Sequence, residues 1–112
     1  MERENAIIAN ADLGVEDHGI FTCFLTLEGQ SWGQGFGGYA LDTWVESEKR
    51  RMGTAFGMEF IRGLLKTFGC SMWSQLKGKH CRIERENGMI TRIGHYVKDQ
   101  WFDPKQISKE AR

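Results

Sequence analysis

Histidine and cysteine are the side chains in this sequence that could bind a metal ion or act in covalent catalysis. The chain holds three of each: His18, His80, His95, Cys23, Cys70 and Cys81. A protein metal site draws on several such ligands at short spacing, as in Cys-x-x-Cys or His-x-x-x-His. Only His80 and Cys81 are close in sequence, and adjacent residues of a strand point to opposite faces. We therefore expect no metal site and no cofactor.

A nucleophilic site could pair the thiol of Cys81 with the imidazole of His95, which would lie near each other in a C-terminal hairpin. Apolar neighbours favour a buried and unreactive cysteine over an activated thiolate. Paired carboxylates are absent from the apolar segments. A cysteine- and histidine-dependent enzyme is therefore the second alternative to a protein that acts by binding without catalysis.

Basic and aromatic side chains gather around the expected hairpin and the glycine-rich stretch before it. The candidate binding residues are Trp32, Phe36, Tyr39, Trp101, Lys79, Arg82, Arg85 and Arg92. A basic groove lined with aromatic platforms is typical of proteins that bind single-stranded nucleic acid. The formal net charge is zero, however, whereas such domains are usually basic. A nucleotide or single-stranded nucleic acid is therefore the first alternative partner.

The stretch GQSWGQGFGGYALD, residues 29–42, interleaves five glycines with aromatic residues. As a strand, it places Gly33, Gly35 and Gly37 on one face and Trp32 and Phe36 on the other. Bare backbone in a strand marks a bend, a bulge or the close approach of another group. We expect the central helix to lie over these glycines. The alternative is an open backbone groove for a flat or anionic ligand.

Composition indicates one globular domain over residues 1–112, with 40% hydrophobic and 27% charged residues. No apolar run approaches the roughly 20 residues of a membrane helix, and the charged N-terminus lacks the pattern of a signal peptide. Three widely spaced cysteines fit free thiols in a reducing compartment. These features favour an intracellular protein without a membrane partner.

The zero net charge conceals an asymmetry along the chain. Residues 1–60 hold four basic and ten acidic residues, whereas residues 61–112 hold eleven basic and five acidic ones. If the fold keeps these halves apart, the surface is dipolar and suits a charged partner or head-to-tail stacking into a homo-oligomer. If the fold interleaves them, the field cancels.

Periodicity predicts an α+β fold. Strands are expected at residues 6–13, 20–27 and 31–41, a polar loop at 42–51, a helix at 53–68 and a hairpin at 79–97. This gives an antiparallel sheet of about five strands, a three-strand meander plus the hairpin, with the one main helix packed on one face. Residues 105–112 are expected to form a frayed tail. The predicted core comprises Phe21, Cys23, Leu25, Phe56, Phe60, Leu64, Ile83 and Ile93.

The register of the hairpin depends on the turn at Asn87-Gly88. A two-residue turn would set Ile83 opposite Arg92, whereas a three-residue loop sets Ile83 opposite Thr91. We prefer the second register because it collects Cys81, Ile83 and Ile93 on one face.

Four blocks of the chain resemble a family of small bacteriophage and prophage proteins. They are GQGFGGYALD (33–42), GTAFGMEFI (53–61), LKGKHCRI (76–83) and IGHYVKDQWFDP (93–104). The resemblance spans nearly the whole chain and supplies no catalytic residues. It implies an accessory protein in the cytoplasm of the bacterial host. We therefore expect a non-enzymatic binding protein that blocks a host anti-phage defence protein or sequesters a small ligand.

Overall fold

The computed structural model describes residues 2–108 and 111 of the chain. Its elements, in chain order, are β1 (Glu2–Val15), β2 (Phe21–Gly29), β3 (Trp32–Ala40), β4 (Asp42–Val45), β5 (Arg50–Gly53), α1 (Ala55–Phe68), a 3-10 turn (Trp73–Gln75), β6 (His80–Glu86), β7 (Met89–His95), β8 (Trp101–Phe102) and a second 3-10 turn (Pro104–Gln106). The α+β class is confirmed.

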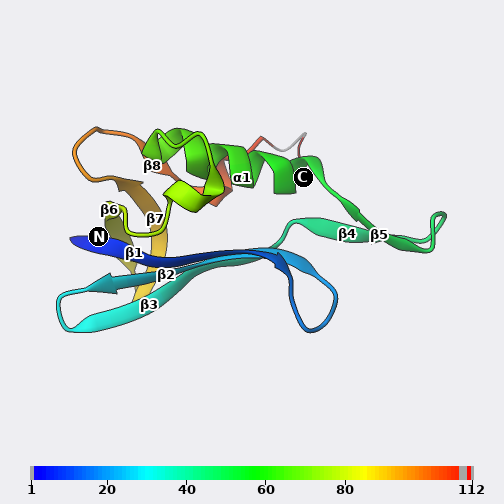
Figure 1. The fold of residues 1–112 in the computed structure, drawn as a ribbon, viewed down its shortest axis with the longest axis horizontal. Helices are drawn as coiled ribbons and strands as arrows, with labels where there is room; N and C mark the ends of the chain where they lie inside the picture. Colours follow the sequence, from blue (N-terminus) through cyan, green and yellow to red (C-terminus); the bar gives the residue numbers. More distant parts are fainter. Residues whose placement is uncertain (1, 109–110, 112) are drawn as a thin grey trace.

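Six strands form one curled antiparallel sheet in the order β3-β2-β1-β6-β7-β8, and α1 packs across one side of it (Figure 1). The long β1 joins the two halves, because residues 2–7 pair with β6 and residues 7–15 pair with β2. The predicted meander and hairpin are therefore both present, and β8 extends the sheet beyond the five strands expected.

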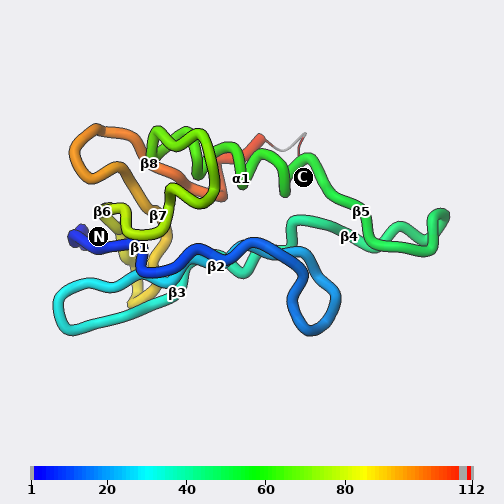
Figure 2. The backbone as a smooth tube through the Cα atoms, in the orientation of Figure 1, coloured from blue at the N-terminus to red at the C-terminus, as the bar shows by residue number. Residues whose placement is uncertain are grey.

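A separate hairpin projects from the body of the molecule (Figure 2). It consists of β4 and β5, which pair only with each other. We expected a polar loop here, since residues 42–51 show no apolar alternation. Backbone pairing and the ion pair between Arg51 and Asp42, at 2.8 Å, hold the hairpin together without a core of its own.

The helix α1 matches its prediction closely. Thr54 caps its first turn by accepting the Gly57 N–H at 2.9 Å, and Gly69 ends it in the left-handed conformation at φ 65°. Phe60 and Leu64 are fully buried. The ring of Phe60 meets that of Phe102 at 4.9 Å between centroids. The predicted core is confirmed, with two of its members, Phe21 and Phe56, only partly buried.

The register predicted for the β6–β7 hairpin is wrong. Asn87 and Gly88 form a two-residue turn with φ of 52° and 79°, and Glu86 pairs with Met89. A register shift beside Arg85 then sets Ile83 opposite Ile93. Neither simple alternative allowed for this bulge, which keeps the tight turn and still buries the apolar residues.

The glycine face does not lie under the helix, contrary to our expectation. Phe36 is buried on the side of α1, where its ring meets Phe102 at 6.3 Å, so the adjacent glycines face away. A side chain at Gly35 would collide with the ring of Phe24 on the outer face. Gly37 and Gly38, at φ 117° and 78°, accompany a register shift that returns Tyr39 to the helix side. The alternation therefore breaks within the stretch.

The C-terminal aromatic residues hold the end of the chain to the body. Phe102 is buried, and Ile107 packs against the core. Of the tail expected at 105–112, residues 109, 110 and 112 lie outside the described part of the chain.

Candidate functional site

Trp101 lies among three arginines on the face of the sheet that is turned away from α1. The guanidinium carbons of Arg3, Arg82 and Arg92 each lie 4.9 Å from the centre of its ring. The strands β1, β6, β7 and β8 contribute one residue each. We call Arg3, Arg82, Arg92 and Trp101 the basic–aromatic patch.

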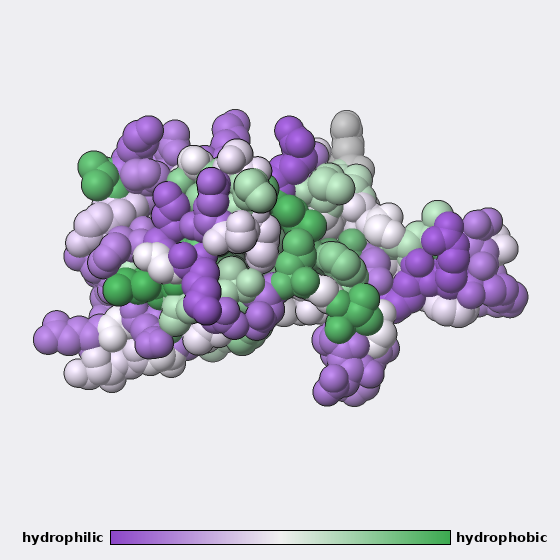
Figure 3. Space-filling model, viewed as in Figure 1, coloured by the Kyte–Doolittle hydropathy of each residue, from purple (hydrophilic) through white to green (hydrophobic). Residues whose placement is uncertain are grey.

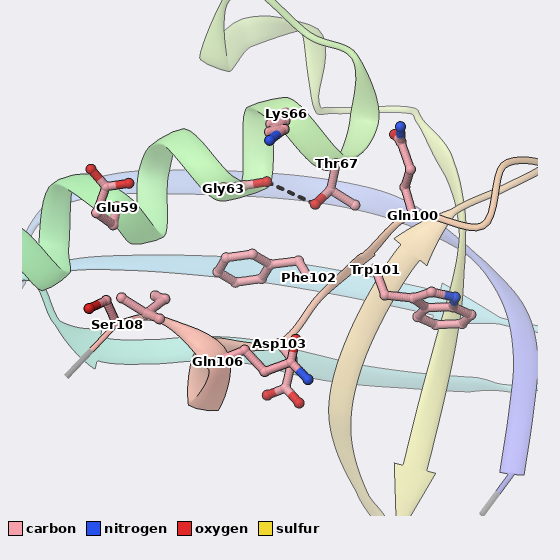
Figure 4. Close-up of a pocket in the computed structure, with 11 residues that line it drawn as sticks. Glu59, Gly63, Lys66, Thr67, Gln100, Trp101, Phe102, Asp103, Gln106 and Ser108 are labelled. Atoms are coloured by element: carbon pink, nitrogen blue, oxygen red, sulfur yellow. Dashed lines mark hydrogen bonds between the residues drawn. The ribbon is translucent and has the colours of Figure 1, made fainter. Parts of the chain in front are cut away.

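The glycine opposite Trp101 makes room for the indole. Gly94 pairs with Trp101 across β7 and β8. A Cβ atom at position 94 would come within 2.6 Å of the ring. Because glycine leaves this space empty, the indole can lie close to the backbone of β7. Figure 4 shows that Trp101 and its neighbour Phe102 point in different directions, with Phe102 directed toward α1.

A buried carboxylate holds two of the three arginines in place. Glu84, only 1% exposed, accepts the Nε–H of Arg92 at its Oε1 and the Nε–H of Arg3 at its Oε2, both at 2.6 Å. These bonds, the one from Arg92 first, lower the pKa of Glu84 despite its burial. Bonding to Glu84 likewise raises the pKa of Arg92. The carboxylate is therefore ionised at neutral pH and fixes both guanidinium groups beside the ring.

The third arginine secures the loop between β7 and β8. Arg82 donates from Nε to the carbonyl oxygen of His95 and from Nη2 to that of Lys98, both at 2.9 Å. The indole N–H of Trp101 donates to Asp99 at 3.1 Å. Arg82 is thus committed to backbone carbonyls, whereas the side chain of Arg3 is 55% exposed and that of Arg92 is 25% exposed.

The other predicted binding residues lie elsewhere. Arg85 makes an ion pair with Glu4 and stacks over Trp32 at 4.6 Å. Phe36 is in the core, and Tyr39 rests on Phe60 with 5.3 Å between ring centres. Lys79 is exposed in the loop before β6. The structure therefore brings together Trp101, Arg82 and Arg92 out of the predicted set, and places Trp32 with Arg85 in a second contact.

Sequence reasoning missed Arg3, which lies 98 positions from Trp101. Its signal was the complementary charge of two strands: Glu2 pairs with Arg85, and Arg3 with Glu84. Opposite charges placed directly across two strands stabilise their pairing. The matching runs ERE at 2–4 and RIERE at 82–86 thus indicated that β1 and β6 are neighbours.

The predicted backbone groove is only partly open. The ring of Phe24, 43% exposed, occupies the space above Gly35. At Gly37, where φ is positive, a side chain would collide with the backbone carbonyl of Cys23. Of these three glycines, only Gly33 has free space above it. Gly33, Gly35 and Gly37 therefore do not form one continuous bare surface.

A shallow groove of about 520 Å³ runs between α1 and the C-terminal segment (Figure 4). The ring of Phe102 lies beside Gly63, whose carbonyl oxygen accepts the hydroxyl of Thr67 at 2.8 Å. The rim carries both signs of charge, from Glu59, Lys66 and Asp103. This mixed polarity offers a place for a small ligand but favours neither an anion nor a cation.

The cysteine–histidine pair is in register but is chemically unsuited to nucleophilic attack. Cys81 lies directly opposite His95. Burial raises the pKa of the Cys81 thiol to about 12, so the sulfur is protonated at neutral pH. The Nδ1 atom of His95 accepts the backbone N–H groups of Val97 and Lys98 at 3.1 and 3.0 Å. Within the described residues, no three His, Cys, Asp or Glu side chains gather as a metal site would need.

Comparison of the chain with models of protein families, with curated proteins and with solved structures found no match. In the described part of the chain, no helix is long and apolar enough to cross a membrane. The site itself therefore carries the functional argument.

Proposed function

We propose that this chain acts by binding an acidic surface of a partner protein through the basic–aromatic patch, and that it performs no catalysis. The observation that carries the proposal is the preorganised contact of Trp101 with Arg3, Arg82 and Arg92 above the buried Glu84. Tryptophan and arginine are the residues most enriched at the energetic centres of protein interfaces. Because Glu84 already holds Arg3 and Arg92 in position, binding would cost little side-chain entropy.

A protein partner fits the patch better than single-stranded nucleic acid does. A base stacks on an open aromatic face, but Trp101 lies against Gly94 and is surrounded by guanidinium groups. Trp32 is likewise covered by Arg85. Glu84 offsets one of the two charges of Arg3 and Arg92, and Glu4 offsets that of Arg85, so the remaining charge suits a few acidic side chains better than a continuous phosphate backbone.

The resemblance to phage and prophage proteins supports a setting for this activity. An accessory protein of that kind acts in the bacterial cytoplasm, where it would block a host protein, with an anti-phage defence protein as the expected target. Masking a surface needs stoichiometric binding and no turnover. The groove between α1 and the C-terminal segment supports a second form of this function, in which the chain sequesters a small ligand instead of masking a protein surface.

The test is capture of host proteins from bacterial lysate by the purified chain, followed by affinity measurement with the captured protein. Arg3→Ala is the diagnostic variant, because Arg3 is exposed and Glu84 keeps Arg92 as a partner without it. Arg62→Ala, on the exposed side of α1, is the matched control. We expect Arg3→Ala to weaken binding at least tenfold, which corresponds to about 1.4 kcal/mol, and Arg62→Ala to bind normally.

Two results would overturn this proposal. A partner held equally well by Arg3→Ala would place the interface elsewhere on the molecule. Retention that disappears after nuclease treatment, with oligonucleotide binding that weakens steeply with salt, would support the nucleic-acid alternative instead.

A further inference from the structure

The sheet topology separates the two signs of charge. Residues 10–41, which form the second half of β1 together with β2 and β3, hold four acidic residues and no lysine or arginine. Residues 77–98, which include β6 and β7, hold six basic and two acidic residues. In the strand order β3-β2-β1-β6-β7-β8 these segments occupy opposite ends of the sheet. The asymmetry along the sequence therefore becomes an asymmetry between the outer faces of the two halves of the sheet, although its curl brings Trp32 and Phe36 of β3 against Arg85 and Phe102.

The acidic end presents a face on the side of the sheet away from α1. Cys23, Leu25 and Leu27 point into the core, so the residues between them point outward. Asp12 pairs with Phe24, and Glu28 pairs with Gly33. We define the acidic face by Asp12, Phe24, Thr26, Glu28, Gly33 and Gly35. Its exposed Phe24 ring lies over the bare backbone of Gly35.

The basic–aromatic patch lies on this same outer side, at the other end of the sheet. Cys81 and Ile83 are buried, so Arg82 and Glu84 between them point away from the core. One molecule thus carries an acidic surface with an exposed aromatic ring and a basic surface with an exposed arginine. Each surface has the charge and the chemistry that the other would select in a partner.

We propose that a second copy of this chain docks head to tail, with the acidic face of one molecule against the basic–aromatic patch of the next. Gly33 pairs with Glu28 and leaves bare backbone beside it, so a neighbouring molecule can approach this acidic side chain closely. Asp12 and Glu28 would meet Arg3 and Arg92 of the neighbouring copy, and Phe24 would contribute apolar area. The contact is heterologous, so each copy uses each surface once and association continues beyond a dimer.

One consequence rests on the proposed function of the patch. A copy that covers Arg3 and Trp101 excludes an acidic partner protein from the same residues. Self-association would then limit the amount of free patch at high protein concentration, and partner binding would dissociate the assembly.

The experiment is sedimentation velocity of the purified chain over a range of concentration, at low salt and at 1 M salt. We expect the average mass to rise with concentration at low salt and to return to that of a monomer at 1 M, where the screening length is only about 3 Å. Two variants remove one surface each: Asp12→Lys with Glu28→Lys on the acidic face, and Arg3→Ala on the patch. Each should be monomeric alone, at concentrations where Arg62→Ala still associates.

Mixing the two variants is the decisive measurement. The Arg3→Ala chain keeps its acidic face and the Asp12→Lys, Glu28→Lys chain keeps its patch, so a head-to-tail contact predicts a discrete one-to-one complex. A mixture that remains monomeric overturns the proposal. So does a wild-type chain that is monomeric at every concentration, or a mass that does not respond to salt.

This test is separable from that of the proposed function. The Asp12→Lys, Glu28→Lys chain retains the whole patch and should bind the partner protein with unchanged affinity at concentrations where the wild-type chain is monomeric. Loss of self-association with retained partner binding supports both proposals. If the wild-type chain self-associates as expected but the Arg3→Ala chain still binds the partner protein normally, only the proposed function is overturned.

Discussion

At the scale of single residues, Glu84 makes the clearest energetic prediction, because it is a buried carboxylate bonded to two arginines. Glu84→Gln removes the charge and leaves the partly buried Arg92 without its counter-ion. Breaking a buried pair in this way costs roughly 3 kcal/mol in unfolding free energy. Glu86→Gln, two residues along β6 and exposed, is the control and should be silent. Denaturant unfolding at pH 7 measures both.

The pH dependence of that loss follows from the direction of the pKa shift. The folded-state pKa of Glu84 is lowered by its bonds to Arg92 and Arg3, so the folded state binds this proton more weakly than the unfolded state does. The contribution of Glu84 to stability is therefore complete at pH values above the ordinary glutamate pKa of about 4.3. It is lost as the pH falls through the folded-state pKa of Glu84. The stability gap between wild type and Glu84→Gln should narrow below about pH 4. A gap that stays constant down to pH 2 would contradict this account.

Substitution of Gly57 in α1 should lower stability, whereas substitution of Gly35 in β3 should not. Helix and strand propensities do not predict this difference. At Gly57 a side chain would meet the backbone carbonyl of Leu41, which cannot move freely. Gly57→Ala should cost about 1–3 kcal/mol by overpacking, although alanine favours a helix. At Gly35 the obstacle is only the exposed ring of Phe24, which can swing outward. Gly35→Val should therefore change stability by less than about 1 kcal/mol. Thermal melts of both variants test the pair, and a larger loss for Gly35→Val would show that the glycine face is covered after all.

At the scale of elements, α1 is held to the sheet by an aromatic cluster centred on Phe60. Its ring lies 4.9 Å from that of Phe102 and 5.3 Å from that of Tyr39, measured between centroids. Phe60→Ala should cost about 3–5 kcal/mol, since it removes a fully buried ring from a site closed by strands on several sides. Met58→Ala, at a position 57% exposed on the same helix, should fall within about 0.5 kcal/mol of wild type. Equal melting temperatures for the two variants would refute the packing of α1.

At the scale of the whole molecule, β1 organises the charges. In the described sheet, it is the only strand that pairs through backbone hydrogen bonds with a member of the β2–β3 pair and with a member of the β6–β7 pair. The acidic and basic segments are therefore paired to one shared strand, and the curl of the sheet also brings Trp32 and Phe36 of β3 into contact with Arg85 and Phe102. The polar β4–β5 hairpin projects separately from this body (Figure 3). The head-to-tail contact that we propose depends on this arrangement.

The sequence by itself determined the elements with local signals. The four-residue spacing of Phe56, Phe60, Leu64 and Phe68 was sufficient to predict α1, because amphipathic spacing acts within one helix. The alternation of Cys23, Leu25 and Leu27 likewise determined the buried side of β2. Such patterns need no knowledge of distant contacts.

Only the tertiary structure decided the bulges and the site. The register of β6 and β7 and the break at Gly37 and Gly38 each depend on one extra residue, which periodicity cannot locate because a bulge shifts every later side chain to the other face. The patch joins Arg3 to Trp101 across four strands, so it exists only once the whole sheet has paired. Phe36 illustrates the same limit. Its type suited a binding surface, but the side of the sheet on which α1 settled placed it in the core.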